Sequence, residues 1–427
     1  MTGISPSGAS APVDAPPPLR RNRDFLLLWT SAGATQFGAR IGVIAYPLLI
    51  LWGNGSASDA GLVAFAGLLP MLVLQLPAGV MVDRWDRRRL MLICNVVGLA
   101  AMLSVVAVVV AGSVWLPHIL AVAFVDGAAT IFYQLAERTA VRNVVHPDRL
   151  SSALAQNEAR GRAAGLLGQP AGGAAFSLAG WLPFGLVAGG HLLSLINLSL
   201  VKAPFQEERE PGERDWKAEV KQGLSWLWGQ RFLRAAICVV AGTNLLFQIV
   251  NMAPLVVIRA QGGSAAQVGV IGLVSGLGGV AGALSAGKLL TGFKLPNILL
   301  GTLLSWTILV PTVALTTQYW AMLVLYAAMS FTGAALNVGA GAYMAHLVPD
   351  EIHGKAMSAV MLASWGANSL GALAAGFLLE AFSTTAVLLG VAAAMLTTGD
   401  CVRTALYWVS ISRAHTRSPV AASTDIR

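Results

Sequence analysis

The 427-residue chain is 56% hydrophobic and only 11% charged, and its mean hydropathy is +0.68. A surface so poor in charge excludes a water-soluble domain and indicates a chain that uses the lipid bilayer as its solvent. The net charge of +8 suits anionic lipid headgroups rather than nucleic acid, because the basic residues are dispersed among short loops between apolar stretches.

Residues 1–19 are rich in Pro, Ser and Ala, which predicts a disordered tail. Apolar runs of roughly 18–26 residues follow, and each is long enough to cross a hydrocarbon core of about 30 Å. The first six runs predict an N-terminal bundle over 20–201, with spans near 25–51, 61–82, 90–111, 116–137, 151–178 and 183–201. Six further runs predict a C-terminal bundle over 232–412, with spans near 233–258, 266–289, 296–316, 319–343, 355–379 and 384–411. The sequence therefore predicts an all-α integral membrane protein with twelve transmembrane helices.

A charged segment at 202–231 separates the two bundles and ends in an amphipathic stretch. It predicts a cytoplasmic linker with an interfacial helix, and residues 413–427 predict a C-terminal tail. An even number of spans places both termini on one side of the membrane. Of the 28 Lys and Arg residues, only Arg40 and Arg259 fall outside that side, so the positive-inside rule predicts a multi-pass cell-membrane protein with cytoplasmic termini.

Two charges fall inside predicted spans. Arg40 lies in the middle of the first span. Placing its charge against lipid would cost at least about 2.5–3.5 kcal/mol, so its side chain must face a cavity or a partner. Asp126 in the fourth span is its expected partner, because at a rise of about 1.5 Å per residue the two side chains lie at similar depths. Protonation of Asp126, or its pairing with substrate, is then a candidate step that drives transport, and a permanent structural ion pair is the alternative.

The fifth span is rich in glycine and opens with charge. Small residues let helices approach closely and a proline frees a backbone carbonyl, so a hinge or packing seam is expected at Gly165, Gly168, Pro170, Gly172 and Gly173. The opening charges, Glu158, Arg160 and Arg162, are expected near the membrane surface, either in a gate network or reaching towards headgroups. His191 in the sixth span is expected to be a neutral, packed side chain.

An internal repeat relates the two bundles. A Pro-Asp pair at 147–148 precedes the fifth span, another at 349–350 precedes the eleventh, and a Gly- and Ala-rich helix follows each. Parallel repetition of a six-helix unit is typical of transporters whose two halves rock about a site near the middle of the membrane.

The loop between the second and third spans reads GVMVDRWDRRR from Gly79 to Arg89. This stretch resembles the loop signature of the major facilitator superfamily, and the resemblance extends over nearly the whole chain. The matching residues are Gly79, Asp83, Arg84, Arg87 and Arg88, whereas Asp86 stands where that signature commonly has a second glycine. Three further stretches, at 22–25, 223–234 and 354–357, resemble the drug and macrolide exporter branch.

The resemblance implies two functional regions. In the first, Asp83 interacts with the start of helix 11 and with a basic residue at the end of helix 4, and so forms a cytoplasmic latch. Arg138 and Arg142 are the candidates for the basic residue. The alternative is that the loop only fixes the topology. The second is a central cavity surrounded by helices 1, 4, 7 and 10, although each polar residue expected there could instead bond between helices. These residues are Gln36, Thr130, Tyr133, Glu137, Asn244, Gln248, Asn251 and Asn337.

We therefore expect a monomeric secondary exporter, not an enzyme, that moves a lipophilic or amphiphilic drug, antibiotic or natural product by proton antiport with alternating access. Its partners are the small-molecule substrate, protons and the lipid bilayer. No cofactor or metal is expected, because Cys94, Cys238 and Cys401 lie in apolar runs without ligand spacing. A metabolite symporter of the same fold and a non-transporting receptor or scaffold are the alternatives.

Overall fold

The computed structural model describes residues 18–206, 231–293, 295–316, 318–347 and 350–398, and every regular element in these ranges is helical. The predicted interfacial helix and C-terminal tail lie outside the described residues. The first half contains η1 (Leu19–Arg21), α1 (Arg23–Trp52), α2 (Ala57–Val73), α3 (Gln75–Arg84), α4 (Arg87–Val110), α5 (Leu116–Val144), η2 (Pro147–Arg149), α6 (Leu150–Leu178) and α7 (Leu182–Leu200). The second contains α9 (Arg231–Ala260), α10 (Ala265–Gly292), α11 (Leu295–Leu315), α12 (Tyr319–Leu347), α13 (Asp350–Ala381) and a helix at Thr384–Thr398.

Nine of the described helices are long and apolar enough to cross a membrane. They are α1, α4, α5, α7 and α9–α13. The bent pair α2–α3 gives a tenth if it forms one span. The remaining expected spans correspond to α6 and to the helix that begins at Thr384, so the total of twelve stays a prediction.

The predicted second span is two helices rather than one, because α2 and α3 meet at 60°. Pro77 lies in the first turn of α3 and has no backbone N–H to donate to the carbonyl of Val73, the last residue of α2. Its ring would also clash with that carbonyl in a continuous helix. The break therefore falls at Leu74, and α3 turns away to carry Asp83.

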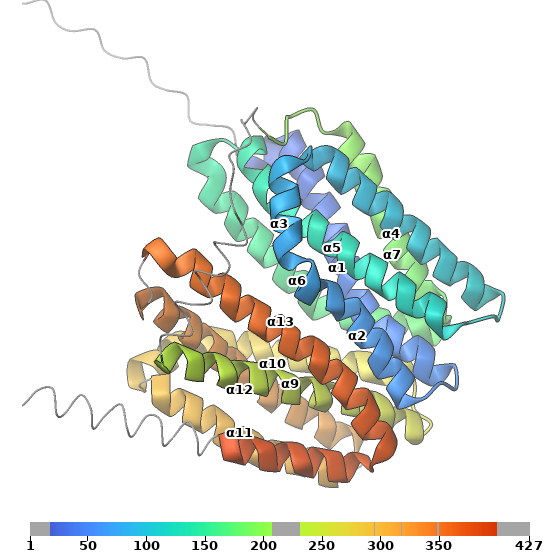
Figure 1. Cartoon of the computed structure of the whole chain (residues 1–427), viewed down its shortest axis with the longest axis vertical. Coiled ribbons are helices and arrows are strands. Elements are labelled where there is room, and N and C mark those ends of the chain that lie inside the picture. The colour runs from blue at the N-terminus through green and yellow to red at the C-terminus, as the bar shows by residue number, and fades with distance from the viewer. Residues whose placement is uncertain (1–17, 207–230, 294, 317, 348–349, 399–427) are drawn as a thin grey trace, which may run out of the picture.

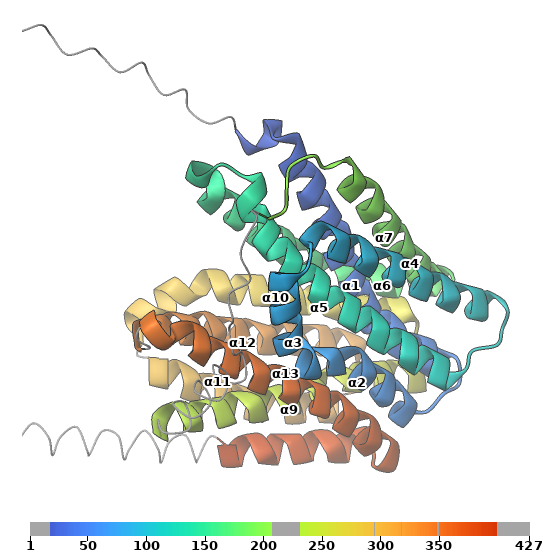
Figure 2. The ribbon, with the colours of Figure 1, turned by 45° about the horizontal axis from the view of Figure 1, so that its top comes forward.

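The two halves form bundles that lie side by side, α1–α7 in blue to green and α9–α13 in yellow-green to red (Figures 1 and 2). They approach backbone to backbone at one end, which we call the Asn54 end. A Cβ atom on Gly61 of α2 would lie 2.6 Å from Cα of Gly376 on α13, and one on Gly173 of α6 would lie 2.9 Å from Cα of Gly269 on α10. Because lipid gives helices no hydrophobic drive to associate, close approach through small residues supplies the packing energy.

Polar contacts between the halves reinforce the Asn54 end. Glu380 accepts a hydrogen bond from the backbone N–H of Ala57 at 2.7 Å, and Ser177 accepts one from Ala266 at the same distance. Each oxygen satisfies an orphan donor at a helix N-terminus of the opposite half. Arg259 of α9 donates to the carbonyl of Leu51 and to the side chain of Asn54, both at 2.8 Å.

Gly376→Val should loosen this closure, because any added side chain meets the backbone of α2. In a cysteine-free background, we expect a cysteine placed at the buried Ala57 to react at least about tenfold faster with a membrane-impermeant maleimide. Gly390→Val is the matched control, since a Cβ there has no neighbour within 4 Å. Equal labelling of the two variants would show that the glycine crossing does not hold the halves together.

Candidate functional site

A cavity of about 2800 Å³ lies between the two halves. The contacts at the Asn54 end close it on one side. On the other side its wall reaches Arg138 and Arg142, which are exposed, so the cavity opens at what we call the arginine-rich end, the end that also carries the loop from Asp83 to Arg89. This volume exceeds that of the pocket for a typical drug-sized ligand, about 300–1,000 Å³.

Most residues that the sequence assigns to a cavity lie in its wall. They are Gln36, Thr130, Glu137, Asn244, Gln248, Asn251 and Asn337, and the charged residues Arg40 and Asp126 also lie in this wall. Tyr133 is the exception, because its ring is 3% exposed and its hydroxyl lies 3.3 Å from the hydroxyl of Ser194, inside the first half. The structure thus turns Tyr133 away from the cavity and towards α7.

Asp126 contacts His191 and not Arg40. Its Oδ1 lies 3.7 Å from Nε2 of His191, and both side chains are buried. Asp126 faces α1 at Gly42, where a Cβ atom would lie 3.8 Å from Oδ2. Since each helical residue turns by about 100°, Arg40 projects from nearly the opposite side of α1, towards Gly168 of α6. The expected depth match therefore does not bring the two charges together, and no ion pair of Arg40 occurs among the described residues.

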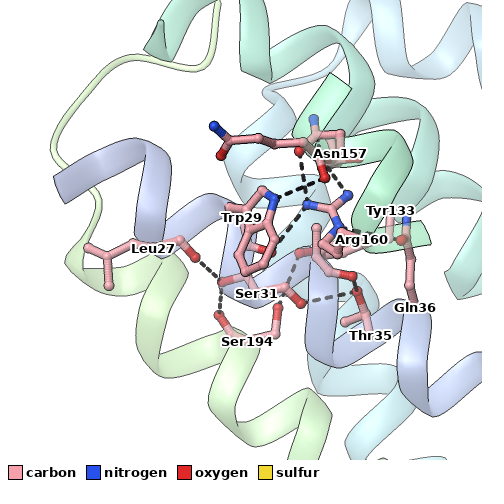
Figure 3. Close-up of polar contacts among 12 residues, drawn as sticks. Leu27, Trp29, Ser31, Thr35, Gln36, Tyr133, Asn157, Arg160 and Ser194 are labelled. Atoms are coloured by element: carbon pink, nitrogen blue, oxygen red, sulfur yellow. Dashed lines mark hydrogen bonds and ion pairs between the residues drawn. The ribbon is translucent and has the colours of Figure 1, made fainter. Parts of the chain in front are cut away.

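The second buried acid of α5, Glu137, pairs with Arg160 of α6. Arg160 Nη2 donates to Glu137 Oε1 at 3.1 Å, and both side chains are at most 5% exposed. The same guanidinium donates to the carbonyl of Trp29 and to Asn157 Oδ1, each at 3.2 Å, and to Gln36 Oε1 at 3.4 Å (Figure 3). A planar fork with several donors can satisfy partners on three helices at once. This network ties α1, α5 and α6 together beside the cavity.

The burial of Arg160 contradicts the expectation that it reaches towards headgroups and leaves the alternative, a polar network beside the cavity. Glu158 and Arg162 are 68% exposed, form an ion pair at 2.9 Å and line the central cavity. Arg160 lies between them in sequence, and two residues along a helix is more than half a turn. An exposed i,i+4 pair therefore directs the intervening residue inward, and this signal was present in the sequence.

The second half lines the cavity with uncharged groups. All charged residues among the described lining belong to the first half. In the second half, Tyr326 donates to the carbonyl of Val250 at 2.6 Å and Trp306 donates to that of Met329 at 3.2 Å. With their polar atoms satisfied, these rings offer apolar faces, and Phe247 packs edge-on to Trp306 with centroids 4.4 Å apart.

The small residues of α6 divide between two neighbours, and the helix continues through Pro170. Gly168 and Gly172 pack against α1 of the same half, whereas Pro170 and Gly173 pack against Gly269 across the seam. Gly165 lines the cavity and has no neighbour within 4 Å of its Cβ position. The predicted packing residues thus serve both the first bundle and the seam.

The stretch from Gly79 to Arg89, which joins the end of α3 to the start of α4, contacts the last turn of α7 and the segment that follows it. Arg87 donates to the carbonyl of Phe205 at 3.2 Å and Arg88 to that of Ser199 at 3.0 Å. Asp83 and Arg84 are exposed, and a Cβ atom on Gly79 would have open space. The side chains at the start of α13, where a latch partner is expected, lie outside the described residues.

Comparison with known proteins identifies the family. A model of the Major Facilitator Superfamily matches residues 28–294 and, in a second match, residues 248–424. The multidrug efflux pump Tap of Mycolicibacterium fortuitum is 24% identical over 385 residues, which cover 88% of this chain and 94% of the relative. Tap of Mycobacterium tuberculosis strain H37Rv is 36% identical over 85 residues, 20% of each chain.

Solved structures share the fold. A bacterial homologue of the human lysosomal transporter Spinster, in an inward-facing and unoccupied conformation, has a TM-score of 0.71 at 13% identity, covering 95% of this chain and all of that one. The nucleoside transporter NupG also has a TM-score of 0.71 at 13% identity, covering 90% of this chain and 98% of that one. Family and fold are thus those of membrane transporters of small molecules rather than of enzymes.

Arg160→Met should destabilise the protein strongly, because it leaves Glu137 buried without its cation, a change that costs about 3–5 kcal/mol. Thermal unfolding of the detergent-solubilised protein measures the loss. Arg162→Met removes the exposed pair in the same helix and should cost at most about 1 kcal/mol. A double variant, Glu137→Gln with Arg160→Met, should recover much of the stability; equal unfolding temperatures for the two single variants would contradict the assignment.

Proposed function

The chain belongs to the major facilitator superfamily, and we propose that it is a secondary exporter of lipophilic or amphiphilic small molecules, driven by proton antiport. The observation that carries the proposal is a buried acid, Asp126, in the wall of a large cavity that is open at one end and closed at the other by separable contacts. Alternating access needs such a cavity, and coupling needs a group that can gain and lose a proton within it.

The cavity wall supports an amphiphilic substrate. Apolar residues and the rings of Phe247, Trp306 and Tyr326 offer dispersion contacts, while amides such as Asn244 and Gln248 offer a few hydrogen bonds. The similarity to a relative named as a multidrug efflux pump favours export of drug-like compounds. A proton that moves with the membrane potential supplies about 2.3 kcal/mol per 100 mV, enough for accumulation ratios above tenfold.

A proton symporter for a polar metabolite is the second candidate. It is favoured by the amide-rich wall of the second half and by the fold shared with a nucleoside transporter. The two functions differ in the direction in which a proton gradient drives the substrate.

We also propose that the arginine-rich end faces the cytoplasm, in keeping with the positive-inside rule. The cavity is then open to the cytoplasm. Closing it would bring α3 towards the start of α13, and the open space beside Gly79 and the exposed carboxylate of Asp83 suit such an approach. A carboxylate near a helix N-terminus gains about 0.3–1 kcal/mol, so Asp83 would favour the closed state.

Inside-out vesicles with an acidified lumen should accumulate a substrate from a panel of fluorescent lipophilic compounds, including ethidium. Asp126→Asn should lower gradient-driven accumulation to the level seen without a gradient, because the variant has no carboxylate to protonate, while substrate binding is retained. Accumulation that needs the opposite gradient would favour symport. No gradient-dependent movement of any compound would favour a receptor or scaffold.

Asp83→Asn should slow transport with insertion into the membrane unchanged, because the amide lacks the charge that favours closure of the arginine-rich end. Initial transport rates at equal amounts of membrane protein measure the effect, and we expect a loss of about threefold or more, corresponding to about 0.6 kcal/mol. Asp148→Asn, an exposed acid in another loop, serves as the control. Wild-type rates for Asp83→Asn would reduce the loop to a determinant of topology.

A further inference from the structure

His191 of α7 joins three helices of the first half. Its Nδ1 lies 3.0 Å from Oδ1 of Asn95 on α4, and its Nε2 lies 3.7 Å from Oδ1 of Asp126 on α5. The exposed fractions of the three residues are 7%, 0% and 8%. An imidazole and a carboxylate are thus held together away from bulk water, where neither charge is well solvated.

Asn95 fixes the orientation of the imidazole hydrogen. The Nδ2 group of Asn95 donates to the carbonyl of Met91 at 2.9 Å, which turns its Oδ1 towards His191. An amide oxygen can only accept, so Nδ1 of His191 must carry a hydrogen. The other ring nitrogen, Nε2, therefore points at Asp126 as the group that can gain or lose a proton.

The contact between Nε2 and Asp126 requires one proton. With that proton present, the pair is either an imidazolium beside a carboxylate or a neutral imidazole beside a carboxylic acid, and both arrangements attract. Without it, the lone pair of Nε2 faces a carboxylate, and the two repel in a medium that screens them poorly. Loss of the proton therefore favours separation of the His191 side chain from that of Asp126.

Space and access suit a proton path. A Cβ atom on Gly98 would lie 2.5 Å from Cε1 of His191, so only glycine leaves room for the ring. Beside the ring lies a second cavity of about 10 Å³, roughly the space for one water molecule. Gln36, Thr130 and Gln134 line both this small cavity and the central one, while Asp126 itself lines the central cavity.

The other titratable groups near the pair belong to three helices. Cys94 of α4 and Tyr133 of α5 line the small cavity, and Tyr46 of α1 lines the central cavity with Asp126. Thiols and phenols ordinarily keep their protons near neutral pH, so they do not compete for this role. Arg40 of α1 points away towards α6, and the charge of Glu137 is matched by Arg160.

We propose that His191 and Asp126 together carry the proton that is exchanged for substrate, and that Asn95 is the positioning residue that holds the imidazole in the required tautomer. This inference rests on the proposed antiport. One proton is taken up by the pair when it faces the acidic side and given up on the other, with no other bond made or broken. The charge left behind then biases the first half towards its alternative packing.

Nitrogen-15 NMR of histidine-labelled, full-length protein in lipid nanodiscs tests the shared proton without any substrate. The His191 signals are those missing from His191→Gln. We expect Nδ1 to carry a hydrogen in the wild type, and the Nε2 signal to change in Asp126→Asn, because that nitrogen faces the carboxylate. An Nε2 signal that is the same in Asp126→Asn, or an Nδ1 that carries no hydrogen, would overturn the proposal.

Transport tests the role of the pair in coupling. With a compound that the wild type accumulates, His191→Gln should still bind the compound, but its accumulation should fall to the level seen without a gradient. Asn95→Ala should shift the pH profile of accumulation. His118→Gln is the matched control, because His118 contacts Ser104 at 3.1 Å and lines neither cavity. If the gradient drives accumulation equally in the wild type and in His191→Gln, this inference is overturned and the antiport stands. If the wild type accumulates no compound, the antiport itself is overturned.

Discussion

The structure depends on backbone contact between the two halves at the Asn54 end. Two crossings without side chains, Gly61 with Gly376 and Gly173 with Gly269, allow an approach that any Cβ atom would prevent. Because helices in lipid gain little from apolar burial, such packing and the polar caps around it must hold the halves together. The cavity and its opening at the arginine-rich end follow from closing one end and leaving the other apart.

Electrostatics divides the cavity into two walls. The first half holds the charges and satisfies its buried ones internally, Glu137 through Arg160 and Asp126 through His191. The second half contributes amides, together with the aromatic rings of Trp306 and Tyr326, whose polar atoms bond to its own backbone. A buried charge keeps its cost low only while its partner stays in place, so each ion pair constrains the helices that carry it, whereas the neutral wall has no such requirement.

The sequence predicts the helices well because hydropathy and length directly reflect the solvent that each span must meet. It also predicts which polar stripes face the cavity, since helical periodicity is a local property. It fails where rotation about the helix axis or packing between distant helices decides the outcome. Arg40 and Asp126 match in depth but not in direction, and nothing local in the chain connects Asn95 with His191.

The separation of the charged wall from the neutral wall has a genetic consequence. Substitutions among the aromatic and amide residues of α9, α11 and α12 can alter which compounds fit without touching the ion pairs of the first half. For the proposed exporter, variation in the compounds recognised is therefore open to single point mutations, whereas variation in the energy source requires coordinated changes in several helices. Under selection by a new toxic compound, such a molecule would adapt through its second half and leave its first half nearly unchanged.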